Sequence, residues 1–249
     1  MDNLQLATLS ITGALAGWLN VMAGGGSLLT VPAMLFMGIP APVANGSNRI
    51  GILMEGVAAV ASFHRRGFSD FRLSLSLAAT ASLGAAGGAM LGVKMDGVWF
   101  DRLLALAIIA VMILMASDNK SHAPAAETDG KPKRLLLGHI CMIGAGFWGG
   151  LIQIGVGFIL MPILHRVMGL DLVRVNMHKV FVVLVYTLIA LLIFAGSVEI
   201  LWSAGLALGL GMMLGAWLGA HTAIRHGELW IRRVLFATLA LITVKLLWP

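Results

Sequence analysis

Residues 24–38 read GGGSLLTVPAMLFMG, and residues 155–169, in the second half of the chain, read GVGFILMPILHRVMG. Each stretch places glycines before a short apolar segment that contains one proline and ends on a glycine. A glycine in a helix interior costs about 1 kcal/mol relative to alanine. We therefore predict that a helix breaks at Gly24–Ser27 and that another breaks at Gln153–Gly157.

The two stretches belong to an internal duplication. Pro32 and Pro162 are separated by 130 residues (162 − 32), and after one inserted residue the separation becomes 131 and stays there. The pairs at this constant separation are Gly38 with Gly169, Asn45 with Asn176, Gly84 with Gly215, Gly88 with Gly219, Trp99 with Trp230 and Arg102 with Arg233. Paired Asn, Trp and Arg at one offset, with a proline pair one residue from it, are not expected by chance, so two copies of one unit are predicted.

The composition is that of a membrane protein. Of the 249 residues, 59% are hydrophobic and 11% are charged, and the mean hydropathy is +0.94, whereas soluble domains carry about 25% charged residues. The basic residues lie in short loops, so the net charge of +6 indicates a positive-inside topology and no nucleic-acid binding. Cys141 is the only cysteine, which excludes an intrachain disulfide. The start of the chain has no basic run, and we expect a first helix rather than a signal peptide.

Apolar segments that are long enough to cross or enter a bilayer alternate with short loops. One polar stretch, 118–134, is predicted to be a cytoplasmic linker between repeat 1 (1–117) and repeat 2 (135–249). The predicted segments run over about 4–22, 27–38, 46–63, 73–93, 102–117, 135–152, 156–168, 178–195, 201–220 and 233–248. The fold class is an all-α, polytopic transmembrane bundle of two repeats whose first segments are broken.

Loop charge predicts how the two repeats are oriented. The loop 64–72 carries three arginines, whereas its counterpart near Glu199 carries no Lys or Arg. If the first loop is cytoplasmic, alternation puts 13 of the 17 basic residues inside and four outside. Equivalent loops on opposite faces predict inverted repeats; four parallel spans per unit is the alternative. Whether the second segment of each unit spans the membrane or re-enters it stays open.

The two breaks predict a substrate site. Non-helical backbone at membrane depth is tolerated where it is buried in protein or lines a wet cavity, and paired breaks mark transporter sites. The helices that resume near Ser27 and Phe158 present backbone N–H groups and positive dipole ends to an anion. The residues that we predict to bind it are Gly24, Gly25, Gly26, Ser27, Gln153, Gly155 and Gly157. Asn20 and Gln153 flank the breaks as polar liners or, equally, as interhelical hydrogen-bond partners.

A second polar group opens the third segment of each unit. Its members are Asn45, Ser47, Asn48 and Arg49 in the first copy and Asn176, His178 and Lys179 in the second. Amide, guanidinium and ammonium groups are the donors that a small oxyanion needs in a dry site. We therefore add Asn45, Asn48, Arg49, Asn176, His178 and Lys179 to the predicted substrate-binding residues. The alternatives are that the asparagines cap helices and that the two cations extend to the membrane interface.

Three further predictions concern single residue types. Glu55 lies in an apolar segment, where an acid is costly unless it is neutral, paired or functional, so it is a candidate for proton coupling. The glycines expected to serve close helix packing are Gly84, Gly87, Gly88, Gly215 and Gly219. The histidines show no metal-ligand spacing with a carboxylate or thiol, so neither a metal nor a cofactor is expected.

These residues resemble a known family. The glycine-rich break with Ser27 and Pro32, the run GIPAPVANGSNR over residues 38–49, and the second-copy runs GVGF and NMHKVF resemble the TauE/SafE sulfite exporter family, whose members are also called TSUP transporters. The resemblance covers nearly the whole chain. It implies a multi-pass protein of the bacterial or archaeal inner membrane that transports sulfite or related organosulfur anions.

The residues and the resemblance together predict a secondary transporter and not an enzyme. The expected activity is export of sulfite-like anions by alternating access, with proton coupling and a homodimer as open possibilities. The alternatives are an importer or channel for another small anion and a structural membrane protein.

Overall fold

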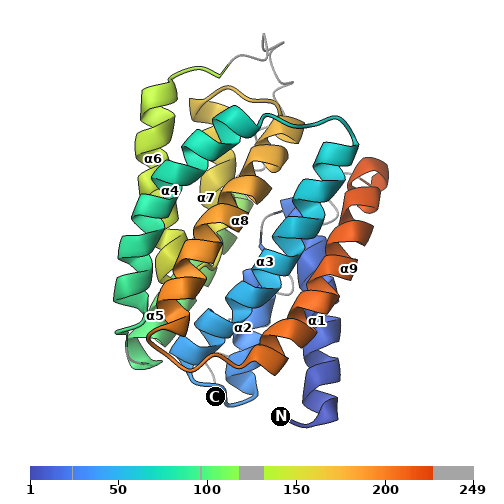
Figure 1. The fold of residues 1–249 in the computed structure, drawn as a ribbon, viewed down its shortest axis with the longest axis vertical. Coiled ribbons are helices and arrows are strands. Elements are labelled where there is room, and N and C mark those ends of the chain that lie inside the picture. Colours follow the sequence, from blue (N-terminus) through green and yellow to red (C-terminus); the bar gives the residue numbers. More distant parts are fainter. Residues whose placement is uncertain (24, 96, 118–131, 227–249) are drawn as a thin grey trace.

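The computed structural model describes residues 1–23, 25–95, 97–117 and 132–226, and these residues contain helices and no strand (Figure 1). The predicted segment 233–248 and residues 118–131 of the predicted linker lie outside them. The helices, in chain order, are α1 (Asn3–Ala23), α2 (Ser27–Phe36), α3 (Ala41–Arg65), α4 (Phe71–Gly92), α5 (Gly97–Ser117), α6 (Leu135–Leu151), α7 (Val156–Pro162), the π-helical segment η2 (Ile163–Val167), α8 (Leu172–Ala195) and α9 (Trp202–His226). The prediction of an all-α fold is confirmed.

α3 and α8 begin earlier than predicted, as α5 does at Gly97 rather than near residue 102. α3 begins at Ala41 rather than near residue 46, and Pro42 stands in its first turn, where a missing N–H costs nothing. α8 begins at Leu172 rather than near residue 178, because the Asp171 carboxylate accepts two hydrogen bonds of 3.0 Å from backbone N–H groups of the first turn. The polar residues that were predicted to open these helices therefore lie inside them.

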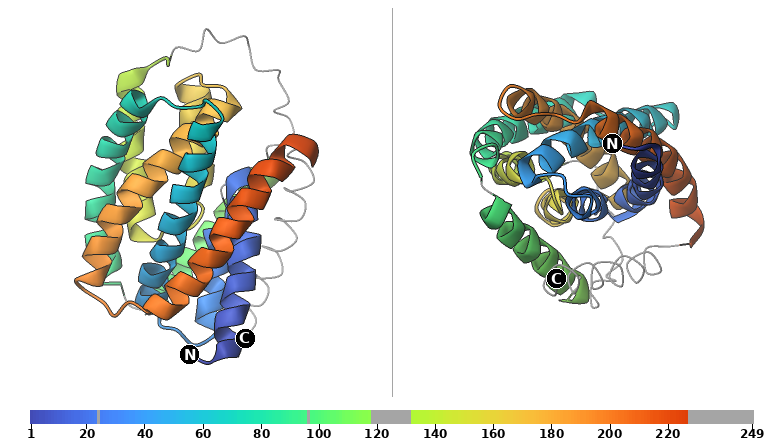
Figure 2. Two further views of the ribbon diagram at one scale, coloured as in Figure 1. Left: turned by 45° about the vertical axis from the view of Figure 1, so that its right-hand side comes forward. Right: turned by 90° about the horizontal axis from the view of Figure 1, so that it is seen from below.

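The two halves of the chain run in opposite directions through the bundle (Figure 1, Figure 2). α1 begins at the lower end in Figure 1, and the chain returns through α2 to that end, from which α3 rises. α6 begins at the upper end, the chain returns through α7 and η2 to that end, and α8 descends from it. α3 and α8, which are the third segments of the two predicted repeats, contact each other in the middle of the bundle.

Each main helix pair has a counterpart in the other half. α1 packs along α9, and α6 packs along α4. α3 also contacts α9, and α8 also contacts α4. If each helix is exchanged for its predicted repeat partner, the α1–α9 contact becomes the α6–α4 contact, and the α3–α9 contact becomes the α8–α4 contact. The two halves therefore interlock rather than lying side by side.

Glycines bring the backbones of these helix pairs together. A Cβ atom built on Gly84 would lie within 1.9 Å of Ile143 O on α6, and one on Gly215 within 1.9 Å of Ala14 O on α1. Gly88 and Gly219 face backbone atoms in the same way. The prediction of close packing is thus confirmed for these four glycines. It is wrong for Gly87, whose nearest neighbour is a side chain at an ordinary 3.8 Å.

The outer surface of the bundle suits a bilayer. Among the described residues, four helical stretches are long and apolar enough to cross one: Asn3–Val21, Phe71–Gly92, Val173–Ala195 and Trp202–Gly219. Large apolar side chains point outward from them, including Leu83, Leu192, Leu214 and Trp217. α3 does not reach the same hydropathy because it carries buried polar and charged residues, among them Asn45, Arg49 and Glu55. The helix that is least suited to lipid is therefore the one that carries most of the predicted site.

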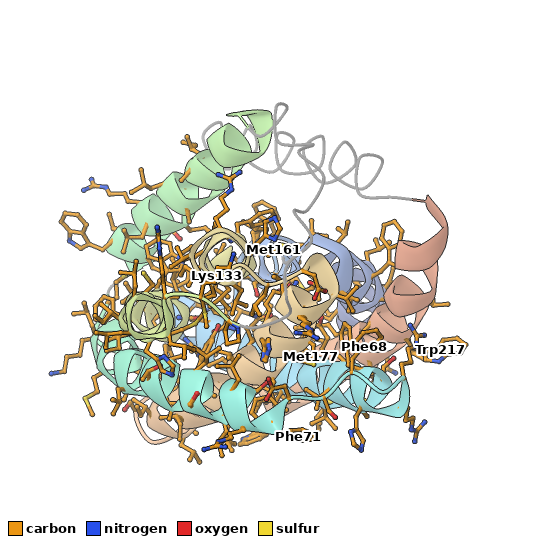
Figure 3. All side chains as sticks on the ribbon, turned by 90° about the horizontal axis from the view of Figure 1, so that it is seen from above. Phe68, Phe71, Lys133, Met161, Met177 and Trp217 are labelled. Atoms are coloured by element: carbon orange, nitrogen blue, oxygen red, sulfur yellow. The ribbon has the colours of Figure 1, made fainter. Side chains whose placement is uncertain are left out.

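Basic residues collect at the upper end of the bundle. Arg65, Arg66 and Arg72 flank the connection from α3 to α4, and Lys133, which Figure 3 labels in a view onto this end, precedes α6. The connection from α8 to α9, at the opposite end in Figure 1, contains Glu199 and no Lys or Arg. This is the distribution that the positive-inside rule predicts for an upper end in the cytoplasm.

Candidate functional site

The first helix break lies where it was predicted. α1 ends at Ala23 and α2 begins at Ser27, while Gly24 is outside the described residues. Gly26 N donates a hydrogen bond of 3.2 Å to Asn20 Oδ1, so the side chain of α1 holds the start of α2. A Cβ atom on Gly26 would lie 2.7 Å from Ala16 O. The backbone of the break therefore passes too close to α1 for any residue other than glycine.

The second helix break is also confirmed. α6 ends at Leu151 and α7 begins at Val156. Gln153 and Gly155 both adopt left-handed backbone conformations, with φ of 64° and 69°. This conformation suits Gly155 but costs a residue with a side chain about 1 kcal/mol or more. The strain at Gln153 indicates that its side chain is required at this position.

The Gln153 side chain joins the break to both long central helices. Its Nε2 donates to Tyr186 Oη at 3.2 Å and to Thr187 Oγ1 at 3.3 Å, both on α8. Its Oε1 accepts a hydrogen bond of 3.1 Å from Arg49 Nη1 on α3. Because all these groups are buried, each depends on the others for its hydrogen bonds.

Arg49 and Asn45 bind the carbonyl end of α6. Arg49 Nη1 donates to Gly149 O at 3.1 Å, and Arg49 Nη2 donates to Gly150 O. Asn45 Nδ2 donates to Leu151 O at 2.8 Å. The last carbonyls of a helix lack partners within the helix and carry its negative dipole end, so a guanidinium stabilises them.

This arrangement overturns the two alternatives for Asn45 and Arg49. Asn45 does not cap α3, which begins at Ala41, and Asn176 does not cap α8, whose N-cap is Asp171. Arg49 does not extend to the membrane interface, because it is 0% exposed and its guanidinium lies 4.5 Å from the centre of the Phe194 ring. Its carbonyl partners lie about a hundred residues away in the sequence, so no local pattern could reveal them.

A small cavity lies between the two breaks. Its volume is about 30 Å³, which leaves room for about two water molecules. The polar groups and glycines around it come from both halves of the chain, and the apolar liners come from α3, α7 and α8. The lining residues are Asn20, Ser27, Ile52, Glu55, Gly56, Ala59, Gln153, Val156, Gly157, Lys179, Val180 and Val183.

Opposite charges face each other across this cavity. Glu55 on α3 and Lys179 on α8 are each 3% exposed, and the Lys179 ammonium attracts the Glu55 carboxylate. Glu55 Oε1 accepts a hydrogen bond of 2.8 Å from Asn20 Nδ2. Glu55 Oε2 is buried and has no hydrogen-bond partner among the described residues. One carboxylate oxygen is thus fixed, and the other is available to a ligand or a proton.

The remaining predicted residues that the structure describes lie around the site without lining the cavity. Asn48 Oδ1 accepts a hydrogen bond of 2.6 Å from Thr30 on α2. His178 Nδ1 lies 2.8 Å from Ser74 Oγ on α4. Asn176 Oδ1 is buried and unpaired within the part of the chain that the structure describes. Of the predicted residues, the structure brings together Ser27, Glu55, Gln153, Gly157 and Lys179.

Several functional partners were missed in the sequence. Tyr186 and Thr187 support Gln153, and Thr30 and Ser74 bind Asn48 and His178. Tyr186 is the only tyrosine of the chain and stands in an apolar segment, and this isolated polar group is a sequence signal for a buried hydrogen-bond partner. The sequence gives no such signal for Thr30 and Ser74, because a lone hydroxyl in a membrane helix often bonds to its own backbone.

A second, smaller cavity lies toward the basic end. Its lining includes Phe68, Phe71 and Met177, which Figure 3 labels at this end. Ala59 lines the central cavity and the next residue of α3, Val60, lines the upper one. The two cavities therefore follow one another along the interface of α3 and α8. Within the described residues, no three His, Cys, Asp or Glu side chains gather as a metal site requires.

Comparison with known proteins gives a consistent result. A family model described as "Sulfite exporter TauE/SafE" matches residues 9–246. "Probable membrane transporter protein ORF9" of Sinorhizobium sp is 28% identical over 97% of this chain and 92% of that protein. A "Probable membrane transporter protein" of Haemophilus influenzae is 27% identical over 98% and 94%, and YfcA of Escherichia coli, with the same description, is 25% identical over 98% and 90%. No solved structure matches the chain.

Proposed function

Since the chain belongs to the sulfite exporter TauE/SafE family, we propose that this multi-pass membrane transporter moves small anions, sulfite and related organosulfur anions first, by alternating access. The observation that carries the proposal is the cavity between the two breaks, with the Lys179 ammonium on its wall. An ammonium group offers three donors to an oxyanion, and its charge-assisted hydrogen bonds are stronger than neutral ones.

The anion is held by groups from both halves. Ser27 stands at the start of the ten-residue helix α2, where a hydroxyl and the positive helix end both favour negative charge. Lys179 faces the same cavity from α8. Of the two cations that were predicted, Lys179 is the one that we assign to the anion. Arg49 and Asn45 act indirectly, because they hold the end of α6 and with it the second break.

Alternating access follows from how the halves are related. We infer inverted repeats, and the opposite directions of α3 and α8 (Figure 1) support this inference. The cavity has room for about two waters, so a sulfur oxyanion enters only when the helices around it separate. Rocking of one half against the other would widen the cavity toward one end at a time.

The driving force sets the direction. An inside-negative membrane potential favours anion export by about 2.3 kcal/mol per charge per 100 mV. Import of the same anion needs a second driving force, and Glu55, which lines the same cavity, is the group that offers one.

Replacing Lys179 by alanine is expected to lower anion flux by about tenfold to a hundredfold, because the anion loses a hydrogen bond to a charged group and a bond of this kind has that effect on binding. The measurement is uptake of sulfite, thiosulfate, sulfate and sulfoacetate into proteoliposomes. Lys133→Ala, at an exposed lysine of the basic end, is the matched control and should transport like wild type. Equal flux in the Lys179→Ala and wild-type proteins would mean that the anion binds elsewhere.

A further inference from the structure

The charge of the central cavity is set by two groups. Glu55 and Lys179 are the charged residues among its described lining. The other elements packed against Glu55 offer neutral groups: Asn20 from α1, Ser27 from α2 and Gln153 from the second break. Arg49, on the same helix as Glu55, is bound to the carbonyl end of α6. When both Glu55 and Lys179 are ionised, the cavity is therefore neutral.

Building on the proposed function, we propose that the anion and the Glu55 carboxylate compete for Lys179, so that each anion binds together with one proton on Glu55. An added dianion such as thiosulfate would otherwise leave three negative charges beside one positive charge in a cavity that holds about two waters. Uncompensated charge is costly in such surroundings. Protonation of Glu55 removes one of these negative charges and leaves Lys179 to the anion alone.

The geometry specifies where the proton goes. Glu55 Oε1 is occupied by Asn20 Nδ2 at 2.8 Å, and an amide can donate to a carboxyl oxygen in either protonation state. Glu55 Oε2 is buried and without a hydrogen-bond partner among the described residues. The proton comes from water on the side to which the cavity is open, forms an O–H bond at Oε2, and returns to water on the other side. The anion takes the place of the carboxylate beside Lys179.

The same contacts link the proton to the first break. Asn20 holds Glu55 Oε1 through its Nδ2 and accepts from Gly26 N through its Oδ1. A change of charge on Glu55 therefore acts directly on the residue that fixes the start of α2. The anion and the proton would thus favour the same arrangement of the break, as coupled transport in one direction requires.

The test measures protons and anions together. Proteoliposomes that contain a pH-sensitive dye receive an inward gradient of thiosulfate or sulfoacetate, whose charge does not change between mildly acidic and mildly alkaline pH. Wild-type protein is expected to carry one proton inward with each anion. In Glu55→Gln the ratio of protons to anions is expected to fall to near zero, whatever flux remains. Glu199→Gln, at an exposed acid of the opposite end, is the matched control and should keep the wild-type ratio.

The outcomes separate this inference from the proposed function. If wild-type protein moves these anions without protons, or if Glu55→Gln keeps the ratio, the competition is overturned and the transporter assignment stands. If wild-type protein moves none of the four anions, the proposed function itself fails. The glutamine of Glu55→Gln can still accept the hydrogen bond from Asn20, so this variant is expected to fold. If it does not fold, the ratio of protons to anions in the wild-type protein still tests the competition.

Discussion

Arg49→Ala is expected to destabilise the protein by about 3 kcal/mol or more, since it leaves four buried acceptors unpaired at about 1 to 3 kcal/mol each. The acceptors are Gly149 O, Gly150 O, Gln153 Oε1 and Asn45 Oδ1. The guanidinium also stacks on Phe194 at 4.5 Å, so the substitution leaves a void beside an aromatic ring. The measurement is thermal unfolding of the purified protein in detergent, followed by tryptophan fluorescence.

Two variants make the Arg49 result specific. Arg72→Ala removes an exposed arginine and should change the free energy of unfolding by no more than about 0.5 kcal/mol. Arg49→Lys keeps the charge but loses the fork of donors, and an intermediate stability is expected. If Arg49→Ala unfolds like wild type and only anion transport is lost, Arg49 binds the substrate and does not hold the end of α6.

Gly146→Ala is expected to destabilise the bundle by about 3 kcal/mol, the upper end of the usual cost of overpacking. A Cβ atom at this position would lie 1.9 Å from Ala81 O. Because the contact is with backbone, no side-chain rotation can relieve it, and α4 and α6 must move apart. Since α6 leads into the second break, transport should fall together with stability.

The matched control lies two residues away on the same helix. Gly144 is exposed, and nothing lies within 4 Å of the Cβ atom that alanine would add. Gly144→Ala should therefore stabilise the helix by up to about 1 kcal/mol, the difference in helix propensity. The comparison is made by unfolding in denaturant and by gel filtration. If the two substitutions had equal effects, close approach of α4 and α6 would not determine stability.

Residue types revealed the breaks and the helices around them. Gly24–Gly26 and the glycines at 155 and 157 interrupt apolar segments, and the structure places helix ends at Ala23 and Leu151. These predictions succeeded because a lack of side chains acts locally. α3 and α8 start before the predicted positions, because polar residues inside a membrane helix resemble those at a helix boundary.

The partners of the polar residues could not be predicted in the same way. Glu55 was recognised as an unusual acid, but the cation that faces it, Lys179, lies on a helix of the other half. Arg49 was recognised as a donor, but its acceptors are backbone carbonyls, which every residue possesses. A sequence shows which groups need partners, whereas the crossing of the two halves decides which partners they find.

The location of the bound anion decides whether the cavity between the two breaks is the substrate site. Crystals of the protein are prepared with the selenium analogue of the sulfur oxyanion that the flux assay identifies, so that anomalous scattering locates it. A selenium peak is expected between the two breaks, within hydrogen-bond reach of Lys179 Nζ and Ser27 Oγ. A peak only beside Arg49 and Asn45 at the end of α6, or no peak between the breaks in a protein that transports the anion, would contradict this assignment.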